Sequence, residues 1–167
     1  MTTIGDVFAV IFTLIGVGLT AWALTLSCGL LFPERVEIAR TSVDRGFWRN
    51  LPLGLLMLLI GAIGVALIAA PVGKLLGWAI VLGVLGIGAV GMAGISHFVA
   101  ARLKQMAPDL GDYPATVRAA AFLVTASMLP VLGWFLFAPA LLLTAFSAGA
   151  RAAFHRASSP AVQPRTI

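Results

Sequence analysis

The side chains that could support catalysis or ion transport in this chain are few, and most of them stand at the ends of long apolar runs. The ionisable residues that border these runs include Asp6, Lys74, Arg102, Arg118 and Arg151. An ionisable group inside a bilayer is expensive to bury and is usually retained for a function. Apart from the thiol of Cys28, the only titratable group within a run is His97, which lies near the end of its run. The sequence therefore offers little chemistry inside a membrane.

His97 has two interpretations. It could ligate a haem or chlorophyll, but a second membrane histidine is missing because His155 lies beyond Arg151. We therefore interpret His97 as a packing or interfacial residue. No Ser/His/Asp set, metal-spaced cluster or carboxylate pair can be assembled across the apolar runs. We expect no cofactor, no bound metal and no enzymatic activity.

Two further features, a GxGxxG pattern and a single cysteine, could suggest chemistry, but both lie inside apolar runs. The pattern GxGxxG occurs at Gly86–Gly91, but it lies inside an apolar run with no strand before it, so it does not predict a nucleotide-binding loop. Cys28 is the single cysteine, which excludes an intramolecular disulfide. Inside an apolar run a cysteine behaves as a small hydrophobic residue.

The composition is that of a membrane protein. Of the 167 residues, 60% are hydrophobic and 10% are charged, and the mean hydropathy is +1.06. Soluble domains are about 45–50% apolar and about 25% charged. The net charge of +5 comes from basic residues beside apolar runs. Such residues indicate membrane topology and contact with anionic lipid headgroups, so we expect no nucleic-acid partner.

The lengths of the apolar runs predict an all-α membrane domain over residues 1–156. A helix of about 20 residues crosses the roughly 30 Å of bilayer hydrocarbon. We expect three long transmembrane helices and a C-terminal helical hairpin whose first arm either crosses or is re-entrant. The predicted spans are 7–32, 51–70, 75–100, 115–129 and 134–151. The Ser- and Pro-containing tail 157–167 is expected to be disordered.

The basic residues favour a turn at 130–134 within the last apolar region. With that turn, ten of the 11 Lys and Arg residues fall on one side of the membrane, and only Lys74 falls on the other. A single crossing through this region would move Arg151, Arg156 and Arg165 to the opposite side. The positive-inside rule therefore predicts an N-terminus outside and a C-terminus in the cytoplasm.

Small residues recur at alternating spacings of four and three in the first and third long runs, which places them on one face of each helix. Such faces let helix backbones approach closely within a membrane. The residues predicted to pack there, within the chain or between copies of it, are Thr13, Gly16, Thr20, Ser27, Gly83, Gly86, Gly91, Gly94 and His97.

The segment 33–50 carries most of the charge. Val36, Ala39, Val43 and Phe47 recur at helical spacing, which predicts a short amphipathic helix at the membrane surface. Together with the polar connection after residue 101, this segment predicts a cytoplasmic docking surface. Its residues are Arg35, Arg40, Arg45, Trp48, Arg49, Arg102 and Lys104.

Several short motifs resemble those of a family of small bacterial membrane modules of unknown function. They are Phe32-Pro33-Glu34-Arg35-Val36, a glycine-rich pair of spans, a basic connection ending in Arg102, and Pro130-Val131-Leu132-Gly133-Trp134. Modules of that kind are sometimes fused to bactofilin-type polymer-forming domains, and this chain has no such soluble domain. The resemblance implies a bacterial inner-membrane protein and no functional residues.

Abundant close-packing signals beside sparse reaction chemistry predict a non-enzymatic membrane protein. We expect a scaffold, anchoring or accessory subunit that forms a homo-oligomer or joins a larger membrane complex. The alternative is a small oligomeric channel or a lipid or solute carrier, for which Thr13, Thr20 and Ser27 are the only polar groups able to line a path.

Overall fold

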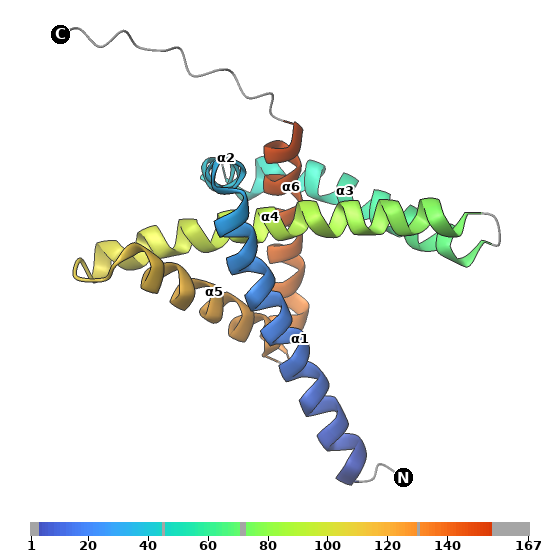
Figure 1. Ribbon diagram of the computed structural model, residues 1–167, viewed down its shortest axis with the longest axis horizontal. Helices are drawn as coiled ribbons and strands as arrows, with labels where there is room; N and C mark the ends of the chain where they lie inside the picture. Colours follow the sequence, from blue (N-terminus) through green and yellow to red (C-terminus); the bar gives the residue numbers. More distant parts are fainter. Residues whose placement is uncertain (1–3, 45, 71–72, 130, 155–167) are drawn as a thin grey trace, which may run out of the picture.

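All regular structure is helical in the computed structural model, which describes residues 4–44, 46–70, 73–129 and 131–154. Within those residues the predicted all-α fold class is confirmed (Figure 1). The elements are α1 (Ile4–Leu31), α2 (Pro33–Val43), α3 (Phe47–Ala69), α4 (Lys74–Met106), α5 (Asp112–Met128), the π-helix η1 (Gly133–Phe137) and α6 (Ala138–Phe154). The predicted disordered tail 157–167 lies outside the described residues.

Four stretches of helix among the described residues are long and apolar enough to cross a membrane, which makes the chain a multi-pass membrane protein by length and composition. They are Gly5–Leu31, Trp48–Ala69, Lys74–Met106 and Gly133–Phe154. The first arm of the predicted C-terminal hairpin corresponds to α5, which has 17 residues and is not one of the four. At 1.5 Å per residue it spans about 26 Å, slightly less than the hydrocarbon core.

Helix α4 is the centre of the fold and contacts α1, α2, α3, α5 and α6. Helix α4 crosses α6 at very short distance, and glycine residues permit this close approach. A Cβ atom added to Gly91 would overlap the backbone of Ala145, and one added to Gly149 would overlap the backbone of Ile87. The two helices therefore meet backbone to backbone, as small residues allow in membranes.

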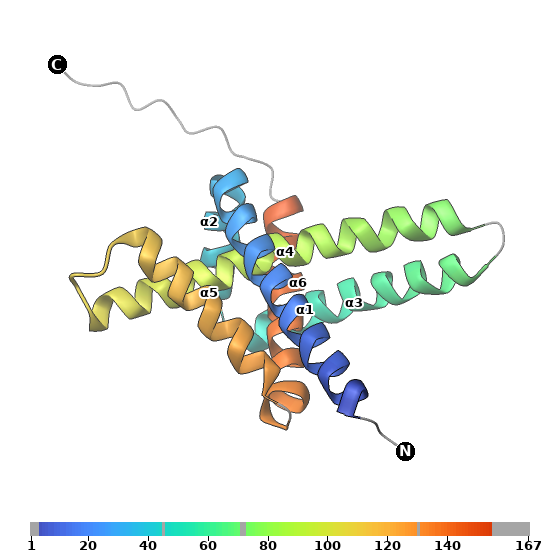
Figure 2. The same cartoon turned by 60° about the horizontal axis from the view of Figure 1, so that its bottom comes forward.

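The outer halves of α3 and α4 form an arm that extends away from the other helices (Figures 1 and 2). Glycines again set the distance between the two helices. A Cβ atom on Gly77 would come within 2.7 Å of the carbonyl oxygen of Gly64, and one on Gly64 would come within 2.8 Å of the Ile80 side chain. Helices α3 and α4 therefore pack closely along the arm, and residues 71–72 between them lie outside the described part.

The predicted amphipathic segment 33–50 is divided between two helices. Helix α2 ends at Val43, and α3 begins at Phe47, four residues before the predicted start of that span. Proline at position 52 therefore stands inside α3 and not in its first turn. The predicted apolar stripe of α2 exists, but α4 and α6 cover it: Val36 packs on Ala93, and Ala39 packs against Ala148.

The chain reverses between α5 and α6. Helix α5 ends at Met128, and the next helix begins at Gly133, whose N–H donates to the carbonyl of Leu129 at 2.9 Å. The first turn after the reversal is π-helical, and Pro139, which lacks an N–H, follows directly. From this reversal α6 runs back towards α2, so the N-terminal end of α1 and the α5–η1 turn lie at one end of the molecule (Figures 1 and 2).

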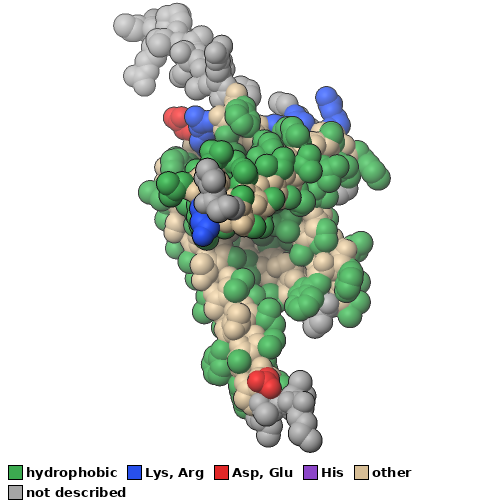
Figure 3. Space-filling model, turned by 90° about the vertical axis from the view of Figure 1, so that its right-hand side faces the viewer, with side chains coloured by type: hydrophobic (Ala, Val, Ile, Leu, Met, Phe, Trp, Pro, Cys, Tyr) green, Lys and Arg blue, Asp and Glu red, His purple; other side chains and the backbone are tan. Residues whose placement is uncertain are grey.

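The outer surface is mainly apolar. Large hydrophobic side chains are exposed along α1, α3, α4, α5, η1 and α6, and they cover most of the face in Figure 3. Basic side chains gather at the upper end of that view, at the level of α2 and of the C-terminal end of α6 (Figure 3). A mainly apolar surface of this kind fits a membrane environment.

Candidate functional site

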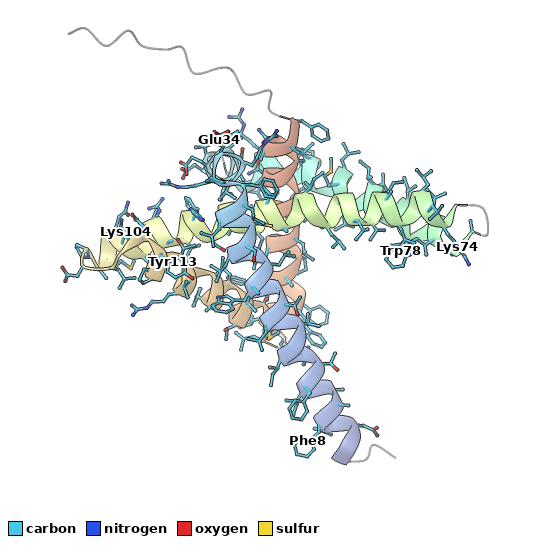
Figure 4. The ribbon with its side chains drawn as sticks, in the orientation of Figure 1. Phe8, Glu34, Lys74, Trp78, Lys104 and Tyr113 are labelled. Carbon is cyan, nitrogen blue, oxygen red and sulfur yellow. The ribbon has the colours of Figure 1, made fainter. Side chains whose placement is uncertain are left out.

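A cavity of about 580 Å³ lies where α1, α2, α4 and α5 converge. Ligand sites in proteins commonly measure 300–1,000 Å³. The cavity is lined by Leu26, Gly29, Leu30, Arg40, His97, Ala100, Ala101, Lys104, Asp112, Tyr113 and Thr116. We call it the interfacial pocket. Figure 4 shows Lys104 and Tyr113 on neighbouring parts of α4 and α5 at one end of the molecule.

Helical spacing explains how these residues come together. The four lining residues of α4 are at positions 97, 100, 101 and 104, which is one face of a helix. Leu26, Gly29 and Leu30 have the same spacing in α1. Glycine at position 29 leaves room for the imidazole, because a Cβ atom there would lie 3.3 Å from Nε2 of His97. The first turns of α5 supply Asp112, Tyr113 and Thr116, and α2 supplies Arg40.

Two ion pairs involve residues that line the pocket. Arg40 Nη1 lies 3.1 Å from a carboxylate oxygen of Glu37, its neighbour on α2. Lys104 pairs with Asp112 across the connection between α4 and α5. The hydrogen bond from Lys104, followed by its charge, lowers the pKa of the Asp112 carboxyl below its usual value. The Asp112 side chain is 91% exposed and that of Lys104 is 39% exposed, so water weakens this pair.

A second group of polar residues joins the ends of α2, α3 and α6. Arg35 donates from Nη1 to the carbonyls of Ala152 and Ala153 in the last turn of α6. Arg151 donates from Nη2 to the carbonyl of Arg49 at 3.1 Å. Asn50 is only 1% exposed, and its Nδ2 donates to the carbonyl of Ser42 at 3.0 Å. These bonds hold α2 and the start of α3 against α6.

Sequence reasoning missed the structural role of Asn50 and Arg151. The side chain of Asn50 is buried, and its hydrogen bond ties it to α2. Its Oδ1 and the Nε of Arg151 are buried without a hydrogen-bond partner among the described residues. The available signal was the presence of an amide and a guanidinium directly beside apolar runs, where polar groups need partners.

The predicted docking residues are dispersed. Arg40 and Lys104 line the interfacial pocket, whereas Arg35 is engaged at the end of α6. The Arg102 guanidinium lies 5.4 Å from the centre of the Phe98 ring and outside the pocket. Trp48 and Arg49 are exposed near the start of α3. Arg45 lies outside the described residues.

The predicted small-residue faces are used unequally within the chain. Gly91 meets α6, and Gly94 meets Ala39 of α2, so both lie at close helix contacts. Around Gly16, Gly83 and Gly86, by contrast, a Cβ atom would find no atom within 4 Å among the described residues. Gly83 and Gly86 also line a groove of about 420 Å³ beside Arg35 and Gly149. We call Gly83 and Gly86 the open glycine face.

The predicted face of α1 also points outward. Thr13, Thr20 and Ser27 are exposed, and α1 packs within the chain through other residues, including Gly18 and Cys28. The hydroxyl groups of Thr13 and Thr20 donate to the carbonyls of Ala9 and Gly16 at 2.7 and 2.8 Å. Whether this face joins copies of the chain stays a prediction.

Among the described residues, no three His, Cys, Asp or Glu side chains are placed to hold a metal ion together. Comparisons with protein-family models, with curated proteins and with solved structures find no match to the chain. The resemblance to small bacterial membrane modules therefore rests on the quoted motifs alone.

Proposed function

We propose that this chain is a non-enzymatic scaffold or accessory protein of the bacterial inner membrane, and that it acts by self-association. The observation that carries the proposal is the open glycine face. The same helix, α4, uses Gly91 and Gly94 for close contacts with α6 and α2, yet leaves Gly83 and Gly86 uncovered. A second copy that packed on this face would gain the backbone contact that drives helix association in lipid.

In the proposed orientation the N-terminus lies outside and the C-terminus lies in the cytoplasm. The direction of α1 and α6 supports this proposal, because both run towards the end of the molecule at which basic side chains gather. The turn between α5 and η1 would then face outward, and α5 would be a short crossing or re-entrant arm sheltered by α1 and α4. Exposed residues of α2 and the start of α3 would form the cytoplasmic docking surface.

The experiment is mass measurement of the protein extracted together with its surrounding lipid, combined with crosslinking in its native membrane. We expect a mass of two or more chains and crosslinks between copies or to a membrane partner. A protein that is strictly monomeric in mild detergent, and that crosslinks to nothing in its membrane, would refute the proposed scaffold.

A further inference from the structure

The interfacial pocket combines groups that a phospholipid headgroup requires. Arg40 and Lys104 approach it from α2 and α4, and Asp112 and Tyr113 approach it from α5. The lining also contains Leu26 and Leu30 of α1, a helix that is long and apolar enough to cross a membrane. The pocket therefore offers polar groups to a headgroup and an apolar surface to an acyl chain.

We propose that the interfacial pocket binds one phospholipid whose headgroup carries both a phosphate and a primary ammonium group. Arg40 and Lys104 bind the phosphate, since both retain unused donors: the guanidinium has five N–H groups and the ammonium three. Asp112 accepts hydrogen bonds from the lipid ammonium, and one acyl chain lies against Leu26 and Leu30. The exposed ion pair between Lys104 and Asp112 opens easily because water already screens it.

The charge balance of the pocket favours a zwitterion over an anionic lipid. The two cations at its rim, Arg40 and Lys104, already face two carboxylates, those of Glu37 and Asp112. An anionic headgroup bound to Lys104 would leave Asp112 without a cation. A headgroup that carries one negative and one positive group instead supplies Asp112 with an ammonium, while Arg40 keeps Glu37 and binds the phosphate through its other N–H groups.

The kind of ammonium also follows from the lining. A quaternary choline group has no N–H to donate and is recognised by cages of several aromatic rings. The described lining contains a single aromatic residue, Tyr113, beside the acceptor Asp112. An ammonium that donates hydrogen bonds to a carboxylate suits this arrangement better than choline does.

The test loads the protein into nanodiscs that contain equal amounts of phosphatidylethanolamine, phosphatidylcholine and phosphatidylglycerol, and identifies the retained lipid by native mass spectrometry. We expect one retained lipid per chain, with phosphatidylethanolamine enriched at least tenfold over the other two. Arg40→Gln combined with Lys104→Gln should lower its retention at least tenfold. Lys104→Gln alone should also lower retention, and its matched control is Arg102→Gln, which removes one positive charge two residues away and outside the pocket; in that control retention should be unchanged.

Asp112→Asn keeps the proposal testable if the double variant fails to fold, because this side chain is 91% exposed. It removes the ammonium acceptor and leaves Lys104 unpaired, so the preference should shift towards phosphatidylglycerol. Equal retention of the three lipids by the natural chain would overturn the proposal. Equal losses of lipid retention in Lys104→Gln and Arg102→Gln would also overturn the proposal, since they would show that the lipid is attracted only to the charge of the protein surface. Because one chain contributes the whole pocket, a monomeric protein that retained the lipid would refute only the proposed scaffold.

Discussion

At the scale of single residues, the polar side chains of this chain act mainly at helix ends. Arg35 illustrates the point, because a residue predicted to contact a cytoplasmic partner instead donates to the last carbonyls of α6. Charge-assisted hydrogen bonds to a helix C-terminus satisfy groups that have no partner within the helix. The residue is therefore part of the fold even if it also contributes to a docking surface.

Arg35→Gln should lower the free energy of unfolding by about 1.5–3 kcal/mol, the usual contribution of hydrogen bonds made by a charged group. The measurement is reversible unfolding in mixed micelles followed by circular dichroism. Arg118→Gln is the control, because Arg118 is an exposed arginine of α5. An equal loss in both variants would mean that Arg35 acts only through net charge.

The Asp112 carboxyl provides a test of pH dependence. Because the Lys104 ammonium lowers its pKa in the folded protein, the pair contributes stability above the unfolded pKa of about 3.9, and this contribution disappears as the pH falls through the lower folded value. Lys104→Gln should raise the pKa of Asp112 towards its ordinary value. Titration of the carboxyl carbon by NMR checks this, and an unchanged midpoint would contradict the ion pair.

At the scale of the helices, glycine has two different uses along α4. Gly91 is required by the crossing with α6, whereas Gly86 has open space around it. Replacing Gly91 by alanine should therefore lower the free energy of unfolding of a single chain, because that site has no room for a methyl group. Replacing Gly86 by alanine should leave it unchanged or raise it, because that site has room and alanine is the better helix former.

Gly91→Ala should destabilise the fold by about 1–3 kcal/mol, the usual cost of overpacking. Gly86→Ala should be neutral or stabilise it by up to about 1 kcal/mol through helix propensity. Unfolding of the monomer, at protein concentrations low enough to prevent association, measures both. Equal destabilisation would show that both glycines are packed within the chain.

The helices themselves could largely be predicted from the sequence, because apolar runs longer than a bilayer leave few alternatives. The spans within α3 and α4 were predicted from the apolar runs, and the turn after Met128 was predicted from the positions of the basic residues. The start of α3 at Phe47 was not predicted, because the apolar run begins only at residue 51, and the bond from Asn50 to α2 is a tertiary contact that no run reveals. The small-residue patterns identified glycines suited to close packing, but the spacing alone could not assign Gly91 to α6 and leave Gly86 open.

The interfacial pocket was beyond sequence reasoning for a similar reason. Arg40, His97 and Lys104 were each recognised, but as members of different features. Their convergence depends on α2 folding back over α4 and on α5 returning along it, which are long-range contacts. Asp112 and Tyr113 carried no signal beyond that of a polar connection.

At the scale of the whole molecule, the proposed topology makes a prediction of its own. In a chain with Cys28 replaced by alanine, a cysteine at position 132 should react with an impermeant reagent added outside the cell. A cysteine at position 156 should react only after permeabilisation. The reason is that basic ends remain in the cytoplasm. Cytoplasmic labelling at position 132, or external labelling at position 156, would contradict the proposed topology.

The most direct test of self-association is the affinity between copies, measured by energy transfer between donor- and acceptor-labelled chains in liposomes at varied protein-to-lipid ratios. We predict association of the natural chain, and an affinity at least tenfold weaker when Gly83→Leu and Gly86→Leu fill the open glycine face. Ala66→Leu, on the exposed surface of α3, should leave the affinity unchanged. Energy transfer no greater than that of randomly distributed monomers, or the same affinity in all three chains, would contradict association through this face.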